Sequence, residues 1–161
     1  MKFFICAVGR AKPSPERELA DLYLDRVRAS GGQCGVTGAD LIEVEERKRL
    51  SADEMKIREG QLLLDAVPKG AFVVALDERG KTQSSQDFSN LIARTRDEGA
   101  PAMAFLIGGA DGHSQTVRDR ADRLLSFGAA TWPHMLVRGM IAEQLYRSIT
   151  IMTGHPYHRQ G

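Results

Sequence analysis

Hydrophobic residues along the chain fall into short continuous runs, separated by longer segments in which apolar positions recur at helical spacing. Four runs are short, apolar and bounded by Gly, Pro or charged residues, which is typical of buried strands. They cover residues 3–8, 41–44, 72–76 and 103–107. Because strands of this kind alternate with helical segments, the pattern predicts an α/β domain with a largely parallel sheet.

The segments between these runs carry helix start signals. Ser14, followed by Pro15 and an acid, predicts an N-cap with proline at the first helical position. A capping box opens a second helix at Ser51. Apolar residues at helical spacing predict a third helix over residues 86–98, with Phe88 on its inner face.

The last third of the chain has a different character. A glycine-rich loop, residues 108–114, follows the fourth run, and a short helix is expected over 114–122. Residues 124–128 are expected as a fifth strand with a sharp end, and residues 136–152 as the final helix. The tail after this helix is short and polar, which predicts no further packed element.

Two other segments are expected as connections. Residues 28–38 are rich in Gly and small polar side chains, which predicts a mobile loop. Residues 78–81, with the sequence Glu-Arg-Gly-Lys, are expected to form a charged turn after the third strand.

Length and composition limit the classes of function. A chain of 161 residues, 42% hydrophobic and 27% charged, suits one compact domain. A formal net charge of +1 is weak for a protein that grips long nucleic acid through phosphates alone. An RNA substrate would therefore be recognised locally or with help from a larger assembly.

Cysteine usage and hydropathy indicate the compartment. Cys6 and Cys34 form no Cys-x-x-Cys pair, and two cysteines cannot build a disulfide framework, so a reducing cytoplasm is expected. The apolar run at the N-terminus is too short for a signal peptide, and Arg10 follows it at once. No apolar stretch has the length needed to span a bilayer. These features predict a cytoplasmic protein without a membrane partner.

The glycine-rich loop, residues 108–114, is the first candidate for chemistry. At the carboxyl end of a parallel strand, glycine lets a ligand approach the backbone closely. An ordinary tight turn explains the loop equally well. A nicotinamide-dependent oxidoreductase would need Gly-x-Gly-x-x-Gly after the first strand, and residues 9–13 do not supply it.

The second candidate is the segment 128–134 before the last helix. Its small residues leave room for a flat ring, exposed amides can read the edge of that ring, and Pro133 stiffens the exit. A plain strand-to-helix connection is an equally good interpretation of this segment alone.

The third candidate is a basic and aromatic group on the last helix and tail. Arginine binds phosphate through two parallel hydrogen bonds, and Tyr and His stack on unpaired bases. For a generic protein, a solvated helix face and a frayed tail is the better interpretation. The group comprises Arg138, Glu143, Arg147, His155, Tyr157, His158 and Arg159.

The sequence lacks the residue patterns that several other chemistries require. The four histidines are not spaced as metal ligands, so no metal is expected. Ser114 and Ser126 lack a Gly-x-Ser-x-Gly elbow, which argues against a serine hydrolase. Asp77, directly after the third predicted strand, is placed either for catalysis or as a surface turn residue.

Taken together and in this order, three C-terminal segments resemble one family, the ribosomal RNA large subunit methyltransferase H group of pseudouridine N3-methyltransferases, in the SPOUT superfamily. The first segment is Leu-Ile-Gly-Gly-Ala-Asp-Gly at 106–112, and the second runs from Pro133-His134 to Glu143-Gln-Leu-Tyr-Arg147. The third is the ending His-Pro-Tyr-His at 155–158. Ala110-Asp111 and Thr131-Trp132 depart from the commonest choices, which alters the shape expected for the donor pocket.

The resemblance implies a fold and a cofactor. The whole chain, 1–161, would be one SPOUT methyltransferase domain, with a trefoil knot and the donor site within about 72–161. True knots are among the rarest connections, and topology rules alone exclude one. The donor would be S-adenosylmethionine. Its implied contacts, carried over by position, are Leu76, Gly109, Gly128, Ala129, Ala130, Thr131, Trp132 and Pro133.

The resemblance also implies a substrate and partners. The substrate would be N3 of a pseudouridine in a stem-loop of large-subunit rRNA, met on the assembled ribosome by a homodimer. In that interpretation Arg138, Arg147 and His155 bind RNA. The implied catalytic residues are Tyr157, His158 and Arg159. The homodimer is also expected because the last helix is apolar over much of its surface, at Met140, Ile141, Leu145, Ile149 and Met152.

Two alternatives stay open on the sequence alone. One is a non-catalytic module that binds the ribosome through the same basic tail, and the other is a SPOUT methyltransferase with another RNA base as its target. Binding of S-adenosylmethionine separates the first alternative from an enzyme. The sequence does not identify the group that removes the proton from the base.

Overall fold

Five parallel strands form one sheet, in the spatial order β2-β1-β4-β3-β5. The structure is a computed structural model that describes residues 1–159, so the last two residues of the predicted domain lie outside the described part. The strands are β1 (Lys2–Val8), β2 (Gly38–Val44), β3 (Phe72–Lys81), β4 (Ala102–Ile107) and β5 (Arg123–Leu125). A five-stranded parallel sheet flanked by helices confirms the predicted α/β class.

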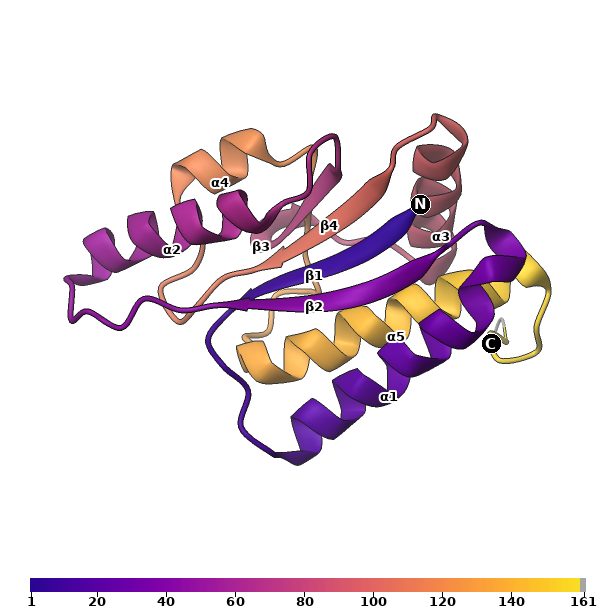
Figure 1. Ribbon diagram of the computed structural model, residues 1–161, viewed down its shortest axis with the longest axis horizontal. Coiled ribbons are helices and arrows are strands. Elements are labelled where there is room, and N and C mark those ends of the chain that lie inside the picture. Colours follow the sequence, from indigo (N-terminus) through magenta and orange to yellow (C-terminus); the bar gives the residue numbers. More distant parts are fainter. Residues whose placement is uncertain (160–161) are drawn as a thin grey trace.

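Helices cover both faces of this sheet (Figure 1). Helices α1 and α3 both pack against α5 on one face, and α2 packs against α4 on the other. The helices are α1 (Pro15–Ser30), α2 (Ala52–Ala66), α3 (Ser85–Asp97), α4 (Gln115–Arg120) and α5 (His134–Thr153). A short 3-10 helix (Gly31–Cys34) follows α1. In the described residues, no helix is long and apolar enough to span a membrane.

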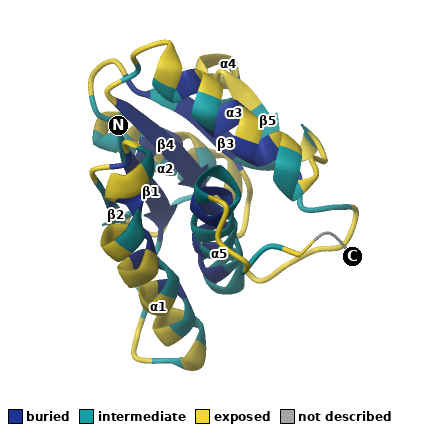
Figure 2. Cartoon of the chain, turned by 90° about the vertical axis from the view of Figure 1, so that its right-hand side faces the viewer, coloured by how far each residue is buried: buried dark blue, intermediate teal, exposed yellow. Residues whose placement is uncertain are grey.

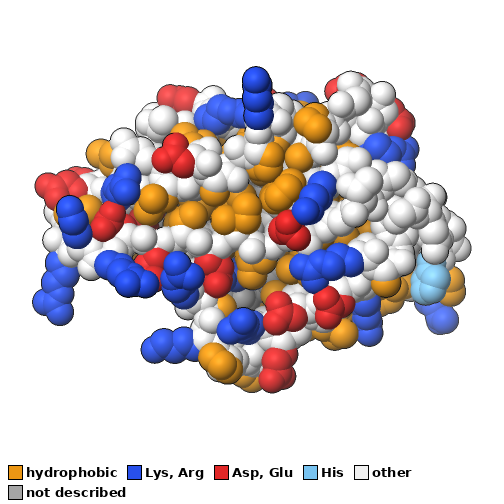
Figure 3. Space-filling model, in the orientation of Figure 1, with side chains coloured by type: hydrophobic (Ala, Val, Ile, Leu, Met, Phe, Trp, Pro, Cys, Tyr) orange, Lys and Arg blue, Asp and Glu red, His pale blue; other side chains and the backbone are white. Residues whose placement is uncertain are grey.

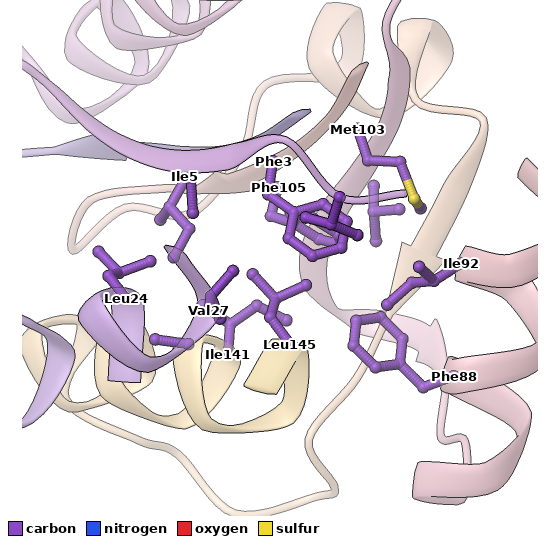
Figure 4. Packing of buried hydrophobic residues seen from close by; sticks show 14 of the residues in the cluster. Phe3, Ile5, Leu24, Val27, Phe88, Ile92, Met103, Phe105, Ile141 and Leu145 are labelled. Atoms are coloured by element: carbon purple, nitrogen blue, oxygen red, sulfur yellow. The ribbon is translucent and has the colours of Figure 1, made fainter. Parts of the chain in front are cut away.

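Two hydrophobic cores lie on opposite faces of the sheet, because successive side chains of a strand point to opposite sides. In β1, Phe3 and Ile5 join the core beneath α1, α3 and α5, whereas Cys6 and Val8 join the core beneath α2 and α4. Figure 4 shows the first core, in which the rings of Phe3 and Phe105 meet edge to face at 6.0 Å. The central strands are accordingly buried, while the outer helix faces are exposed (Figure 2).

Local sequence signals set the helix starts as predicted. The Ser14 side chain accepts a hydrogen bond from the Arg17 amide at 3.2 Å, and the Ser51 side chain accepts one from the Glu54 amide at 3.2 Å. Each bond satisfies one of the backbone donors that a helix N-terminus leaves free. Both predicted N-caps are therefore confirmed.

Two predicted connections are wrong. Residues 28–38 do not form one loop, because α1 continues to Ser30, the 3-10 helix follows, and the Val36 amide bonds the Gly31 carbonyl at 2.9 Å. Residues 78–81 belong to β3, where Lys81 pairs with Leu125 after an irregularity in the ladder. Gly80 is required there, since a Cβ atom would lie 2.5 Å from the Leu124 carbonyl carbon. Hydrogen bonds within the segment order residues 28–38, whereas pairing with the distant β5, which local composition does not encode, extends β3 through residues 78–81.

All five strands end at the same edge of the sheet. The register aligns Val8 with Val44, Ala7 with Ile107, and Leu76 with both Ile107 and Leu125. The connections that follow the strands therefore meet at this carboxyl edge, where parallel α/β sheets place their ligand sites.

Candidate active site

A cleft of about 660 Å³ opens at the carboxyl edge, between the ends of β3, β4 and β5. Its walls are formed by three connections and by parts of α2 and α5. The lining comprises residues 76–79, 107–113, 125–128 and 130–134, together with Lys56 and Val137. This volume lies within the range of cofactor and small-molecule sites in proteins.

The cleft brings together most of the residues that the sequence singled out as donor contacts. Leu76, Gly109, Gly128 and the segment 130–133 all line it, whereas Ala129 does not. These positions are separated by up to 57 residues along the chain, and the parallel register of β3, β4 and β5 unites them.

The glycine-rich loop is both a tight turn and a wall of the cleft. The Gly112 amide donates to the Gly109 carbonyl at 3.1 Å, and Gly112 has φ +78. A Cβ atom on Gly108 would lie 3.2 Å from the Gly112 carbonyl carbon, so a side chain at this position would crowd the turn. The loop can therefore be an ordinary tight turn and also form part of a ligand site.

Two polar residues of the cleft wall were not assigned to the donor site from the sequence. The His113 side chain is 4% exposed, its Nε2 lies 3.2 Å from the Leu106 carbonyl, and its Nδ1 has no partner among the described residues. Burial lowers the pKa of His113, so its ring is neutral near pH 7. No periodicity or motif marks His113, because its burial follows from the fold of the glycine-rich loop.

Asp77 is the second of these residues, and the sequence left its role open. Its side chain is 5% exposed, and one oxygen accepts a hydrogen bond from the Arg79 amide at 2.9 Å. The other oxygen lies 3.9 Å from the guanidinium nitrogens of Arg79 and Arg118, beyond hydrogen-bonding distance. The second carboxylate oxygen therefore makes no hydrogen bond within the described residues and is held only by two ion pairs at 3.9 Å.

The connection between β5 and α5 is held by its own side chains. The Ser126 hydroxyl accepts from the Gly128 amide at 3.1 Å, and the indole N–H of Trp132 donates to the Phe127 carbonyl at 3.2 Å. Trp132 remains 43% exposed at the cleft, which is unusual for a large apolar side chain. The indole is therefore fixed at its polar edge, although much of its surface faces solvent.

Comparison with known proteins identifies the family. The model of the family described as "Predicted SPOUT methyltransferase" matches residues 1–158. The chain belongs to the SPOUT methyltransferases. Relatives named ribosomal RNA large subunit methyltransferase H are 48% identical in Xanthobacter autotrophicus and 51% identical in Mesorhizobium japonicum. Each match spans 159 residues and covers 99% of this chain and 99% of the relative.

A solved structure shares the fold of this SPOUT methyltransferase. A crystal structure from Bordetella pertussis Tohama I, described as a probable methyltransferase, superimposes with a TM-score of 0.53. The match covers 92% of this chain and 95% of that one at 13% sequence identity, so it supports the fold alone.

Arg138 of this SPOUT methyltransferase is not available to RNA, which corrects its predicted role. The side chain is 2% exposed. Its guanidinium donates to Glu43 at 2.6 Å and to the carbonyls of Val8 and Gly9 at 3.0 and 2.7 Å. Because α5 packs this face inward, Arg138 joins α5 to the ends of β1 and β2 instead of holding phosphate.

The Arg147 side chain makes its contacts within the same chain. It donates to Glu143 from Nε at 2.9 Å, and its Nη1 lies 3.2 Å from His158 Nδ1. Its guanidinium also stacks on the Tyr157 ring at 4.9 Å. The side chain is 25% exposed, so a phosphate contact would compete with these interactions.

The tail of this SPOUT methyltransferase is packed, contrary to the expectation of a loose end. The Tyr157 ring meets Tyr146 at 4.8 Å, and its hydroxyl lies 3.0 Å from Glu143 and 3.2 Å from the Tyr23 hydroxyl. Burial and these hydrogen bonds raise the pKa of Tyr157, so the phenol stays protonated near neutral pH. His155 and Arg159 are exposed.

The predicted catalytic residues do not lie in the cleft of their own chain. Tyr157, His158 and Arg159 are absent from the cleft lining, and Tyr157 and His158 contact Tyr23 of α1 and Arg147 of α5. A second groove of about 540 Å³ contains Tyr23 and Glu143, which both contact Tyr157, and shares Ser126, Phe127 and Gly128 with the cleft. Within residues 1–159, no group of three or more His, Cys, Asp or Glu side chains is placed to hold a metal ion.

Proposed function

We propose that this SPOUT methyltransferase transfers a methyl group from S-adenosylmethionine to N3 of a pseudouridine in a stem-loop of large-subunit rRNA, on the assembled ribosome. The observation that carries the proposal is the cleft at the ends of β3, β4 and β5, which unites the predicted donor contacts. Full-length relatives about half identical in sequence carry the name of a large-subunit rRNA methyltransferase, which supports the substrate class. A ribosomal substrate also accords with action in the cytoplasm.

The residues of the cleft fit the donor chemically. S-adenosylmethionine combines a flat adenine, a ribose, and an amino acid whose sulfur carries a positive charge. Apolar walls at Leu76, Ile107 and Val137 suit the ring, and small residues let it approach the backbone. His113 Nδ1 and the second oxygen of Asp77 make no hydrogen bond within the described residues, which makes them candidate acceptors for its polar groups.

A trefoil knot within residues 72–161 is part of the proposal. Close passage of two chain segments supports it, since the Ser126 amide donates to the Lys81 carbonyl at 3.1 Å and the Asp122 amide donates to the Val73 carbonyl at 2.8 Å. The absence of a side chain at Gly80 permits this approach to Leu124. A knot would fix the three donor-binding connections against one another without a separate domain.

We also infer a homodimer in which the tail of one protomer completes the cleft of the other. Ile141, Leu145 and Ile149 no longer support this, because all three are buried in the core of a single chain. The support is the groove that leads from the cleft to Tyr23 and Glu143, beside the packed tail.

The reaction needs alignment and charge stabilisation. The donor supplies an electrophilic methyl group bound to a positively charged sulfur. The protein must hold the base nitrogen in line with that methyl group and stabilise the negative charge that develops as N3 loses its proton. His158 and Arg159 are suited to this stabilisation, and the protonated Tyr157 is suited to donating a hydrogen bond rather than to acting as the base.

Two measurements test the proposal. Calorimetric titration with S-adenosylmethionine should give saturable 1:1 binding per chain. Incubation of donor and enzyme with ribosomes that lack the modification should add one methyl group to one large-subunit pseudouridine, located by mass spectrometry of rRNA fragments. Ribosome binding without donor binding would instead identify a non-catalytic module, and methylation of another nucleotide would identify a different target base.

A further inference from the structure

The RNA backbone requires a binding surface other than the one predicted from the sequence. Arg138 is buried, and Arg147 is engaged by Glu143, Tyr157 and His158. A protein with a net charge of +1 has no general attraction for RNA, so any contact with phosphates has to come from a local concentration of cations.

The connections that follow β1 and β2 carry such a concentration. They leave the sheet side by side, since the Gly9 amide donates to the Val44 carbonyl at 2.8 Å. We call their exposed basic side chains the basic rim. The rim comprises Arg10, Lys12, Arg47, Lys48 and Arg49. Figure 3 shows Lys and Arg side chains gathered at the end of the molecule where β2 finishes.

The acids within this region do not neutralise the rim. Glu45 lies between the two connections, 3.2 Å from Arg10 and 3.9 Å from Arg47, so one carboxylate faces two guanidinium groups. Glu46 is paired at 2.8 Å with Arg58 of α2, which lies outside the rim. The side chains of Arg10 and Arg47 remain 62% and 81% exposed.

Three rim residues make no ion pair within the described part of the chain. Lys12, Lys48 and Arg49 are exposed and make no ion pair within 4.0 Å to any of residues 1–159. The next acids in sequence after these residues, Glu16 after Lys12 and Asp53 after Arg49, lie in the first turns of α1 and α2, where they complement the helix dipoles. These cations are therefore free to bind a ligand.

The rim lies on the same edge of the sheet as the cleft. The edge runs from β2 through β1 to β4 and β3, and neighbouring strands are roughly 5 Å apart. The rim occupies the β2–β1 half of this edge, whereas the cleft occupies the half from β4 to β5. A separation of about 10 to 15 Å follows from this spacing, which a single strand of RNA spans within a few nucleotides.

We propose that the basic rim holds the phosphodiester backbone of rRNA beside the target stem-loop while the target base enters the cleft. The inference rests on the proposed function, because the cleft's substrate determines which polymer reaches this edge. Exposed guanidinium and ammonium groups donate charge-assisted hydrogen bonds to phosphate oxygens. Backbone contacts position a substrate without reading its sequence, and they leave identification of the base to the cleft.

A matched pair of variants tests the rim. In the rim variant, Lys48→Gln and Arg49→Gln remove two unpaired cations. The control, Lys69→Gln with Arg94→Gln, removes one lysine and one arginine that are also exposed and without an ion pair in the described residues but lie toward the amino edge of the sheet. Both variants carry the same change in net charge. Binding to unmodified ribosomes is measured by co-sedimentation over a range of KCl concentrations, together with kcat/KM for ribosomes.

The rim variant should bind ribosomes about tenfold more weakly near 0.1 M salt, and its slope of log affinity against log salt should flatten by roughly 1.5. Affinity for S-adenosylmethionine and kcat at saturating ribosomes should match the parent, and the control should match it throughout. Parental affinity and slope in the rim variant would overturn the inference, as would an equal loss in the control. If the parent methylates no ribosomes, the proposed function fails, while the sedimentation result still decides whether the rim binds RNA.

Discussion

The guanidinium of Arg138 donates to the carboxylate of Glu43 at 2.6 Å and thereby joins α5 to β2, 95 residues apart in sequence. The same side chain donates to the carbonyls of Val8 and Gly9, where β1 ends. Glu43 also accepts a hydrogen bond from the Ala11 amide at 2.6 Å. One ion pair therefore fixes the connections after β1 and β2, from which the basic rim projects, against the helix that follows the cleft.

Substitution of Arg138 should destabilise the fold rather than weaken RNA binding directly. Arg138→Met removes the guanidinium donor from two backbone carbonyls and the cationic partner from the partly buried Glu43 carboxylate, which should cost about 3 kcal/mol of unfolding free energy. Urea denaturation measures the loss. Arg94→Met, at an exposed position of α3, should change stability by less than about 0.5 kcal/mol. If Arg138→Met is as stable as the parent but binds ribosomes more weakly, Arg138 contacts RNA after all.

The same ion pair should make stability depend on acid pH. Burial raises the pKa of Glu43, but hydrogen bonds from Ala11 and Arg138 outweigh burial and hold this pKa below its ordinary value of 4.5. The folded state therefore binds the Glu43 proton more weakly than the unfolded chain. The stabilising effect is complete above pH 4.5 and is lost as the pH falls through the lowered pKa.

Comparison with Glu43→Gln isolates this contribution. The difference in unfolding free energy between parent and variant should stay constant from neutral pH to about pH 5 and shrink at lower pH. Urea denaturation across this pH range measures the difference. If the difference in unfolding free energy between parent and variant grows on acidification, the pKa of Glu43 is raised instead.

Neighbouring alanines allow a sharp test of the donor site. Ala130 lines the cleft and Ala129 does not, although both are exposed. Ala130→Phe should fill the cleft and lower S-adenosylmethionine affinity at least tenfold, whereas Ala129→Phe should bind as the parent does, both measured by calorimetry. Gly109 is a poorer probe, because a Cβ atom there would also meet the Glu59 carboxylate of α2 at 3.0 Å. If Ala130→Phe binds S-adenosylmethionine as tightly as Ala129→Phe and the parent do, the donor site lies elsewhere.

Removal of the tail should affect both stability and catalysis. Deletion of residues 155–161 removes the Tyr157 ring from Tyr146 and its hydroxyl from Glu143, which should cost about 1 to 2 kcal/mol and several degrees of Tm. Donor binding should persist, while methylation of ribosomes should be lost. Tyr157→Phe keeps the ring but loses the hydroxyl contacts, so it should recover most of the stability. A truncated protein with parental methylation rates would exclude a catalytic role for the tail.

Local signals in the sequence determined most of the elements of this protein and the starts of two of its helices, α1 and α2. Ser14 and Ser51 cap helices because the bond from cap to backbone spans three residues, and all the chemistry that it needs is in one short segment. The buried strands were equally predictable, since a strand covered on both faces must be apolar throughout. The order of strands and helices then predicted a parallel sheet whose connections meet at one edge.

Only the tertiary structure decided which charged and aromatic side chains remain available at that edge. Arg138 carries a charge, and charged side chains are usually exposed, yet it is buried because α5 packs it against Glu43. Tyr157 lies in a polar tail, yet it packs because Tyr23 and Tyr146 meet there. Partners that lie far apart in the chain control burial, and burial determines whether a charge serves the fold or a ligand. The sequence therefore predicted most residues that line the cleft, whereas the fold buried Arg138 and left the side chains of the basic rim exposed.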